Sequence, residues 1–351
     1  MNAISTMIQF TLPEHLACPK PTEERNIGRD EVRLLMTTGS GEIEHTSFSH
    51  LDKYLQAGDI LLVNTSAMRP SALPVSLTRG RKGMVHVSNR LNSREWLIEI
   101  REIRESKTIR WKEGEEEMLF QLPDEATVSL RKRFYKDRQL LDLWVAEFAT
   151  NLEPEAYLAK NAQPIQYNKL NERYPLSYYQ TFFSLHPGSS EMPSAGRGFT
   201  RALVERLLKK GIVFAPVLLH TGVSSLEENE SPYPEYMEIS PVSAAMINTA
   251  KDQGKRIIAV GTTAVRAVES AVDKNGVIMP YRGNTDLFID ETRAMKVVDG
   301  LLTGFHEPRA SHLNMIQAIA GLEHIERAYK AALDANYYWH QFGDLHLILP
   351  K

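Results

Sequence analysis

The apolar and polar positions follow three different patterns along the chain. Residues 8–68 hold short apolar runs at Val32–Met36 and Ile60–Val63, with turn residues at Gly39–Gly41 and Gly58–Asp59. These runs predict strands that are joined by tight turns. Between residues 69 and 148, six strand-like segments follow one another at intervals of about 8–12 residues, which is typical of a small β-barrel or sandwich. The segments are Met84–Val87, Trp96–Ile100, Thr108–Trp111, Met118–Leu122, Thr127–Leu130 and Leu140–Val145.

From about Asn151 to the end, helical and strand patterns alternate, which favours an α/β architecture. Thr200 and Ser240 are placed to cap the amino ends of two helices, and Thr262 or Thr263 that of a third. The other predicted helices are Ser311–Ala320 and Ile325–Asn336. The predicted strands are Ile212–Leu219, Arg256–Val260, Asp286–Ile289, Met295–Val298 and Leu345–Leu349.

Composition narrows the class of protein. A chain of 351 residues is long enough for two domains, each with its own core. The net charge of −3 gives no overall attraction to nucleic acid or to an acidic membrane, so a polyanion would need a local patch. The single cysteine, Cys18, cannot form an internal disulfide, and no Cys/His spacing fits a zinc site, so we expect no metal. Neither a signal peptide nor a membrane-length apolar stretch is evident, so we expect a cytoplasmic protein.

The sharpest candidate for chemistry is Arg256–Ser270, where a buried strand runs through Gly261 directly into a helix. This arrangement aims backbone N–H groups at a ligand above the strand end and suits phosphate, carboxylate or ribose hydroxyls. Arg266 and Glu269 share one face of the helix and could form an ion pair. The alternative is a well-capped structural helix with a surface ion pair. The segment is neither a Walker loop nor a dinucleotide fingerprint.

Two further segments place polar groups near expected strand or helix ends. In Pro193–Thr200, Gly196 and Gly198 permit close approach of a ligand to the backbone, and Arg197 offers a charge. A plain loop is the alternative. His220 ends an apolar strand, where active-site groups of α/β proteins tend to lie, and it could act as a base or be a satisfied half-buried residue.

The segment Val298–Pro308 gathers Asp299, Thr303, His306 and Glu307 at another strand-to-loop junction. His306 and His312 do not have the spacing of helical metal ligands, which argues against a metal site here.

A basic cluster lies in the barrel-like region and includes two aromatic residues. It could contact the backbone of a folded RNA or stack on a base. Solvated turns are the alternative. The cations are Arg131, Lys132, Arg133, Lys136 and Arg138.

Taken together, the segments resemble the S-adenosylmethionine:tRNA ribosyltransferase-isomerase family of queuosine biosynthesis. The matching pieces span nearly the whole chain in collinear order. They are Gly41–His45, Leu55–Asn64, Tyr179–Phe183, Pro193–Thr200, Leu219–Gly222, Ile258–Ser270, Thr285–Ile289, Leu301–Pro308 and Phe342–Asp344.

The resemblance implies a mixed α/β, barrel-like main domain formed by residues 1–68 and 151–351, with a small antiparallel β-barrel inserted at 69–150. It also implies a transferase that moves the ribosyl group of S-adenosylmethionine onto 7-aminomethyl-7-deazaguanine in a tRNA anticodon loop. The ribosyl group isomerises to an epoxycyclopentane, giving epoxyqueuosine, and adenine and methionine are released. This chemistry needs a base that removes a proton beside the sulfonium and a pocket that excludes water. We expect a monomer, although no pattern in the sequence determines the oligomeric state.

Several loops depart from the family pattern. Ala195–Thr200 reads Ala-Gly-Arg-Gly-Phe-Thr where the family has Ala-Gly-Leu-His-Phe-Thr, so Gly198 stands where the family has a histidine. The segments Asn64–Met68 and Gly222–Leu226 also differ. These changes leave two alternatives open, namely a paralogue that uses S-adenosylmethionine on a different acceptor and a non-catalytic RNA- or nucleotide-binding descendant.

From these patterns we expect His220 or His306 to be the general base, positioned by Asp286 or Asp299. A larger set is expected to bind the substrates, with Gly261, Thr262 and Thr263 holding the donor and Arg266 orienting a carboxylate or phosphate. The full binding set is Ser194, Gly196, Arg197, Thr200, Thr221, Gly222, Gly261, Thr262, Thr263, Arg266, Glu269 and Thr303.

Overall fold

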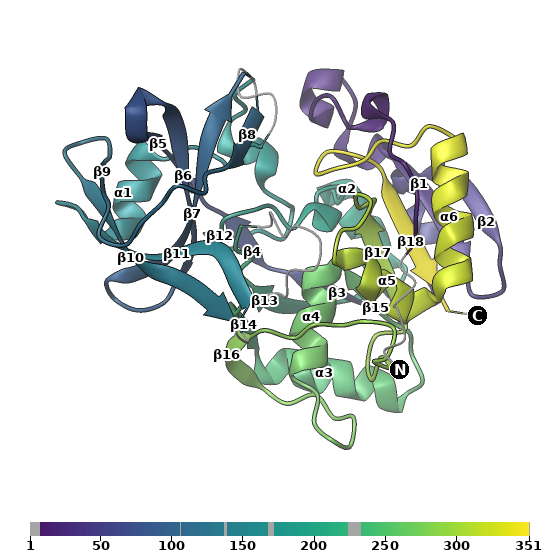
Figure 1. Ribbon diagram of the computed structural model, residues 1–351. Coiled ribbons are helices and arrows are strands. Elements are labelled where there is room, and N and C mark those ends of the chain that lie inside the picture. Colours follow the sequence, from purple (N-terminus) through teal and green to yellow (C-terminus); the bar gives the residue numbers. More distant parts are fainter. Residues whose placement is uncertain (1–7, 106, 137–138, 168–171, 224–232, 351) are drawn as a thin grey trace, which may run out of the picture.

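The computed structural model describes residues 8–350 except 106, 137–138, 168–171 and 224–232. Its largest element is a nine-stranded mixed sheet with the strand order β16-β14-β13-β3-β15-β17-β18-β1-β2. In chain order these strands are β1 (Arg33–Thr38), β2 (Ile43–Ser47), β3 (Ile60–Asn64), β13 (Val213–Leu219), β14 (Glu235–Ile239), β15 (Ile257–Val260), β16 (Tyr281–Thr285), β17 (Gly300–Gly304) and β18 (Leu345–Leu349). Strand β1 lies parallel to β18 (Figure 1), so segments from both parts of the chain build one sheet.

Helices cover both faces of this sheet because its central strands are apolar on both sides. In β3, Ile60 and Leu62 face a core shared with four helices, whereas Leu61 and Val63 face a second core. The four helices are α3 (Pro241–Asp252), α4 (Thr262–Ser270), α5 (His312–Ala320) and α6 (Leu322–Asp334). The second face is covered by α2 (Arg201–Lys209) and the 3-10 helix η4 (Phe48–Lys53). Fully buried strands of this kind are expected where helices flank a parallel sheet.

A separate antiparallel sheet occupies residues 72–149 and appears in blue and teal in Figure 1. Its strands run in the order β5-β6-β7-β11-β10-β9, with β8 paired to β7. It curls around its own core, which contains Trp96 and Trp144, and helix α1 contributes Tyr157 and Leu158. The elements are β5 (Ala72–Ser76), β6 (Lys82–Arg90), β7 (Glu95–Arg104), β8 (Lys107–Arg110), β9 (Leu119–Gln121), β10 (Thr127–Lys136), β11 (Gln139–Ala149) and α1 (Pro154–Asn161).

The remaining elements are short. A two-stranded parallel sheet joins β4 (Ser66–Met68) to β12 (His186–Ser189). The other 3-10 helices are η1 (Glu14–Leu16), η2 (Thr22–Arg25), η3 (Arg29–Glu31), η5 (Thr78–Gly80), η6 (Leu176–Tyr179) and η7 (Ser194–Gly196). Within the described residues, no helix has both the length and the apolar character needed to cross a membrane.

The expected mixed α/β fold with an antiparallel insertion is confirmed, and the inserted sheet is a curled half-barrel. The division into 1–68 with 151–351 and 69–150 stays a prediction, and helix α1, which it assigns to the main domain, packs into the core of the inserted sheet. Thr200 and Ser240 cap α2 and α3 as predicted, by accepting hydrogen bonds from the backbone N–H groups of Leu203 and Ser243. Helix α4 instead takes Gly261, at φ 89°, as its N-cap residue.

Two predicted strands are wrong. Met295–Val298 forms no strand because the carboxylate of Glu269 accepts hydrogen bonds from the backbone N–H groups of Lys296, Val297 and Val298. The strand lies a few residues later, at β17. Asp286–Ile289 follows β16 and lies outside it, where the Leu287 carbonyl accepts a hydrogen bond from Arg266.

Candidate functional site

The carboxyl ends of β3, β13, β15 and β17 meet at one edge of the main sheet because these strands run parallel to one another. We call this the carboxyl edge. In open α/β sheets, ligands bind at such an edge. The loops after these four strands therefore define the candidate site.

Asn64, the last residue of β3, ties the carboxyl edge together. Its side-chain amide donates to the Leu219 carbonyl at 2.9 Å and to Thr263 Oγ1 at 3.1 Å, and its Oδ1 accepts from the Leu219 N–H at 3.1 Å. The residue is 4% exposed. It thus fixes the end of β13 against the start of α4. We did not predict a role for Asn64, although a polar residue directly after the buried run Ile60–Val63 was a usable signal.

His220 follows β13 directly and is held at Nδ1 and by residues packed against its ring. Its Nδ1 lies 2.7 Å from Ser66 Oγ, which in turn lies 2.6 Å from Ser189 Oγ. One face of the ring stacks on Tyr236 with centroids 5.8 Å apart. A Cβ added to Gly188 would lie 2.5 Å from the ring, so only glycine fits beneath it. Burial lowers the pKa of His220 to about 4, so the ring is neutral at pH 7.

His306 follows β17 and belongs to a second polar group. Its Nε2 lies 3.0 Å from Thr303 Oγ1, and its ring stacks on that of His312 with centroids 4.7 Å apart. The Trp339 indole N–H donates to the His306 carbonyl at 3.0 Å and fixes the backbone there. Burial lowers the pKa of His306 well below its ordinary value and that of His312 to about 4. Both imidazoles are therefore neutral at pH 7.

Arg266 lies one turn into α4 and is linked through Glu235 to the loop that follows His220. Its guanidinium pairs with Glu235 of β14 and donates to the Leu287 carbonyl at 3.1 Å. Glu235 also accepts from the Gly222 N–H at 2.7 Å, two residues beyond His220. Burial chiefly lowers the pKa of His312, and the positive charge of Arg266 lowers it further.

Arg266 does not form the expected pair with Glu269, because that carboxylate holds the backbone of Lys296–Val298. The positive charge of Arg266 is balanced by the carboxylate of Glu235. One guanidinium nitrogen, Nη2, is buried and has no hydrogen-bond partner among the described residues. A buried donor of this kind is costly unless a ligand or water satisfies it.

The two carboxylates proposed to position a histidine lie in different places. Asp299 precedes β17 and accepts from the Ile257 N–H at 2.8 Å, so it lies at the opposite, amino edge of the sheet. It lines a hollow of about 280 Å³ there, together with Lys251, Lys255 and Arg256. The structure therefore does not bring Asp299 to either histidine. Asp286 is exposed directly after β16, and its role stays a prediction.

The segment Pro193–Thr200 reaches the carboxyl edge at Ala195, whose Cβ would lie 3.4 Å from a Cβ added to Gly261. Arg197 instead points into the protein, where its guanidinium donates to the Tyr178 carbonyl and to Thr22 and pairs with Glu23. Burial lowers its pKa to about 10. Arg197 thus holds 3-10 helix η2 against the core and is not directed at a ligand.

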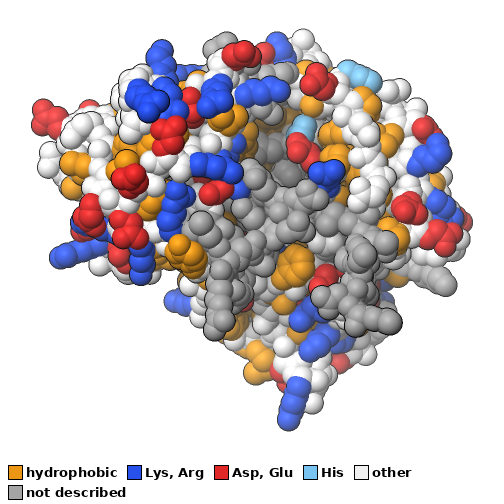
Figure 2. Space-filling view, viewed as in Figure 1, with side chains coloured by type: hydrophobic (Ala, Val, Ile, Leu, Met, Phe, Trp, Pro, Cys, Tyr) orange, Lys and Arg blue, Asp and Glu red, His pale blue; other side chains and the backbone are white. Residues whose placement is uncertain are grey.

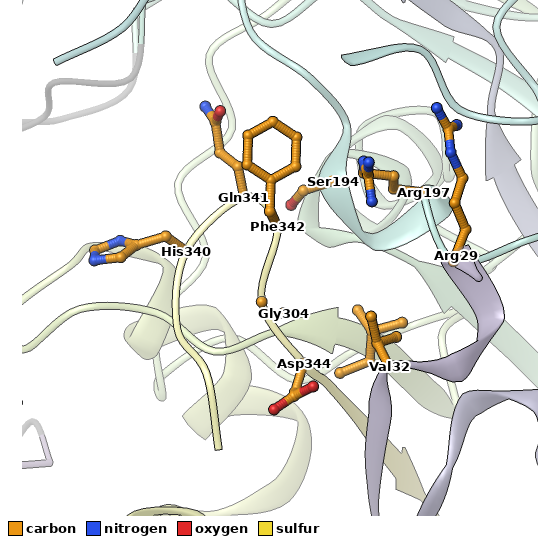
Figure 3. Close-up of a pocket in the computed structure, with 12 residues that line it drawn as sticks. Arg29, Val32, Ser194, Arg197, Gly304, His340, Gln341, Phe342 and Asp344 are labelled. Atoms are coloured by element: carbon orange, nitrogen blue, oxygen red, sulfur yellow. The ribbon is translucent and has the colours of Figure 1, made fainter. Parts of the chain in front are cut away.

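Gly198 has no room for a side chain, because an added Cβ would lie 2.7 Å from the ring of Phe48 and 3.2 Å from Leu345. Phe48 therefore occupies the space that the histidine of the family pattern would need at this position. Next to it, Figure 3 shows a hollow lined by Ser194, Arg197 and Phe342, with an accessible volume of about 10 Å³. This is about the room that a single water molecule requires.

The other predicted binding residues are largely engaged within the chain. Thr200 caps α2 and donates to Asp30 at 2.8 Å. Thr221 donates through Oγ1 to the Glu191 carbonyl at 2.8 Å, and a Cβ on Gly222 would collide with the Tyr233 hydroxyl. Gly196 lies in η7, where an added Cβ would lie 3.4 Å from Thr181.

Two of the five cations in the predicted RNA-binding cluster, Arg131 and Arg133, contact neighbouring side chains. Arg131 pairs with Glu147 and Glu117, and Arg133 stacks over Trp144 at 4.1 Å. Lys132 is exposed, whereas Arg138 lies outside the described residues, as does the side chain of Lys136. Figure 2 shows Lys and Arg side chains interspersed with Asp and Glu over this part of the surface.

A search of the described residues finds no group of three or more His, Cys, Asp or Glu residues that could hold a metal ion. The paired rings of His306 and His312 lie face to face, with an interplanar angle of 12°.

Comparisons with known proteins agree with the resemblance seen in the sequence. Residues 5–348 match the family model described as queuosine biosynthesis protein. The S-adenosylmethionine:tRNA ribosyltransferase-isomerase of Carboxydothermus hydrogenoformans is 35% identical, with 97% of this chain and 98% of that protein covered. The enzyme of the same name from Desulfitobacterium hafniense is 33% identical over the same shares. The crystal structure of S-adenosylmethionine tRNA ribosyltransferase from Thermotoga maritima matches with a TM-score of 0.53 and 25% identity, covering 97% of this chain and 99% of that one.

Proposed function

Because this chain belongs to the queuosine biosynthesis protein family, we propose that it is an S-adenosylmethionine:tRNA ribosyltransferase-isomerase. It transfers the ribosyl group of S-adenosylmethionine to 7-aminomethyl-7-deazaguanine in the anticodon loop of a tRNA and isomerises it, forming epoxyqueuosine. Adenine and methionine leave. S-Adenosylmethionine is consumed as a substrate, and no metal is part of the proposal.

The main support for this proposal comes from the carboxyl edge. There Gly261 leads into the start of α4, and the loops after β13 and β17 carry the neutral imidazoles of His220 and His306. Helix α4 has no side-chain cap at Gly261, and the backbone N–H groups of Thr262 and Thr263 precede its first hydrogen bond, in which the Ala264 N–H donates to the Gly261 carbonyl. Uncapped N–H groups at a helix start favour anionic or polar ligand atoms. We assign Gly261, Thr262 and Thr263 to the polar groups of the donor. The buried Nη2 of Arg266 is placed to bind a carboxylate, such as that of the methionine part.

The reaction also needs a base for the proton beside the sulfonium. A base must be unprotonated at working pH, and both His220 and His306 meet that condition because burial holds their rings neutral. Thr303 orients the ring of His306 through the hydrogen bond at 3.0 Å. His306 and His220 are thus the two candidates, in line with the expectation from sequence.

The tRNA is expected to reach the carboxyl edge across the inserted sheet. Lys132 and Tyr135 are exposed on β10, and Tyr135 is 60% exposed, so a base could stack on its ring. Binding of RNA by Arg131 and Arg133 would require them to exchange their present carboxylate or aromatic partners. A cytoplasmic location and a monomeric state complete the proposal.

The test is to incubate the protein with S-adenosylmethionine and either unmodified tRNA or tRNA that carries the 7-aminomethyl-7-deazaguanine precursor. We expect release of adenine and formation of a new nucleoside only with the precursor-containing tRNA. Binding of the donor without turnover on that tRNA would instead indicate a different acceptor. Binding of tRNA without any binding of the donor would overturn the enzymatic function.

A further inference from the structure

Two buried serines lie behind His220 and come from the small parallel sheet. Ser66 is on β4 and Ser189 is on β12, and both are 0% exposed. Their hydroxyls are 2.6 Å apart, and Ser66 Oγ is also 2.7 Å from His220 Nδ1. Ser189 Oγ accepts the Thr221 N–H at 3.0 Å. The result is a continuous line of hydrogen bonds that ends on the imidazole.

Each serine hydroxyl has one proton to donate, and this determines which atom is the donor and which the acceptor in each hydrogen bond of the chain. Among the described residues, Ser66 Oγ is the one acceptor within reach of the Ser189 hydroxyl proton, because the Thr221 N–H is itself a donor. If Ser189 donates to Ser66, then the Ser66 proton is free to go to His220 Nδ1. The opposite direction would leave the Ser189 proton buried without an acceptor, which buried hydroxyls avoid.

We propose that Ser189 and Ser66 are positioning residues that hold His220 as the neutral tautomer with its proton on Nε2. His220 then serves as a hydrogen-bond donor to the nucleoside substrate and does not act as the base. This inference rests on the proposed function, and it assigns proton abstraction to His306. The atom that accepts from Nε2 is a nitrogen or oxygen of the nucleoside that gains electron density as adenine leaves.

The surroundings of the ring agree with this role. Tyr236 and Gly188 clamp its two faces, so the imidazole cannot rotate away from Ser66. The charged or titratable groups that act on it are Arg69 and His186, and both oppose protonation. His220 is only partly buried, and its Nε2 has no hydrogen-bond partner among the described residues. The donor atom is therefore accessible to a ligand.

Nuclear magnetic resonance of the ¹⁵N-histidine-labelled full-length protein tests the tautomer without any substrate. We expect the His220 signals, identified by their loss in His220→Gln, to report a protonated Nε2 and an unprotonated Nδ1 at pH 7. Ser66→Ala should abolish this single tautomer. The matched control is Ser190→Ala, because Ser190 is equally buried but donates to the Val87 carbonyl. A proton on Nδ1 in the wild type, or an unchanged tautomer in Ser66→Ala, would overturn the proposal.

The role of the donor is tested by adenine release from precursor-containing tRNA. A glutamine amide can donate from a position close to that of Nε2, whereas alanine cannot, so His220→Gln should retain at least about tenfold more turnover than His220→Ala. Equal loss in both variants would show that His220 is the base. If the wild type releases no adenine at all, the proposed function fails, while the spectrum still decides the tautomer.

Discussion

Both edges of the main sheet carry charged and polar side chains, but their hydrogen bonds serve different purposes. At the amino edge, Asp299 holds the Ile257 N–H and Arg256 pairs with Asp59, so these groups fasten strands together. At the carboxyl edge, His220 Nε2 and the buried Nη2 of Arg266 have no hydrogen-bond partner among the described residues. Charge alone therefore does not mark a site in this protein. Hydrogen-bonding atoms that the fold leaves without a protein partner indicate a ligand site better than charge does.

The largest expected effect is on turnover, which replacement of His306 at the carboxyl edge should lower and replacement of a residue at the amino edge should not. We expect His306→Ala to lower the turnover number for adenine release by a factor of about 10² or more, because the reaction loses its base. The control at the amino edge is Lys255→Ala, since Lys255 is exposed in the hollow beside Asp299 and should leave turnover unchanged. Near-normal turnover in His306→Ala would remove this residue from the mechanism.

The amino edge should respond in stability and not in activity. Asp59 is 4% exposed at its side chain, pairs with Arg256 and accepts from the Gln56 N–H at 2.6 Å. We expect Asp59→Ala to lower the free energy of unfolding by about 2 kcal/mol, which is the scale of hydrogen bonds to a charged group. Urea unfolding measures this loss. A fall in turnover of the remaining folded protein would show that the two edges are coupled.

The third expected effect is a change in how stability depends on pH. Burial lowers the pKa of His312 from 6.5 to about 4, so the folded protein favours the neutral ring. Stability is therefore complete above pH 6.5 and falls as the pH drops from 6.5 toward 4, by about 1 kcal/mol per pH unit for one such histidine. His312→Leu should make unfolding free energies less steep by that amount over this range. Lys255→Ala should keep the wild-type slope, and an unchanged slope in His312→Leu would contradict the prediction.

The assignment of Asp299 shows how a small error in a strand boundary affects a site. The apolar run Met295–Val298 suggested a strand that ends before Asp299, which would place that residue at a carboxyl end. The strand begins instead at Gly300, so the same residue lies at the amino edge. Nothing in the run itself indicates that its N–H groups bind the carboxylate of Glu269, which is 27 residues away from Lys296.

The sequence by itself determined the properties that depend on neighbouring residues. The alternation of helical and strand patterns predicted the α/β layers, and the regular spacing of strand-like segments predicted a small β-barrel or sandwich. Thr200 and Ser240 marked their helix starts through local caps. The turn at Gly261 before α4 could also be predicted from the sequence, because its positive φ favours glycine at that one position. Collinear motifs were enough to identify the family.

Only the tertiary structure decided which partner each polar group takes. Arg266 binds Glu235 and not Glu269, Arg197 turns inward to Glu23, and Ser66 meets Ser189 across 123 residues of chain. The sequence contains many carboxylates that could pair with each arginine and many hydroxyls that could bond to each serine. Buried polar groups must all be satisfied at once, so the choice among those partners is made by the packing of the whole fold.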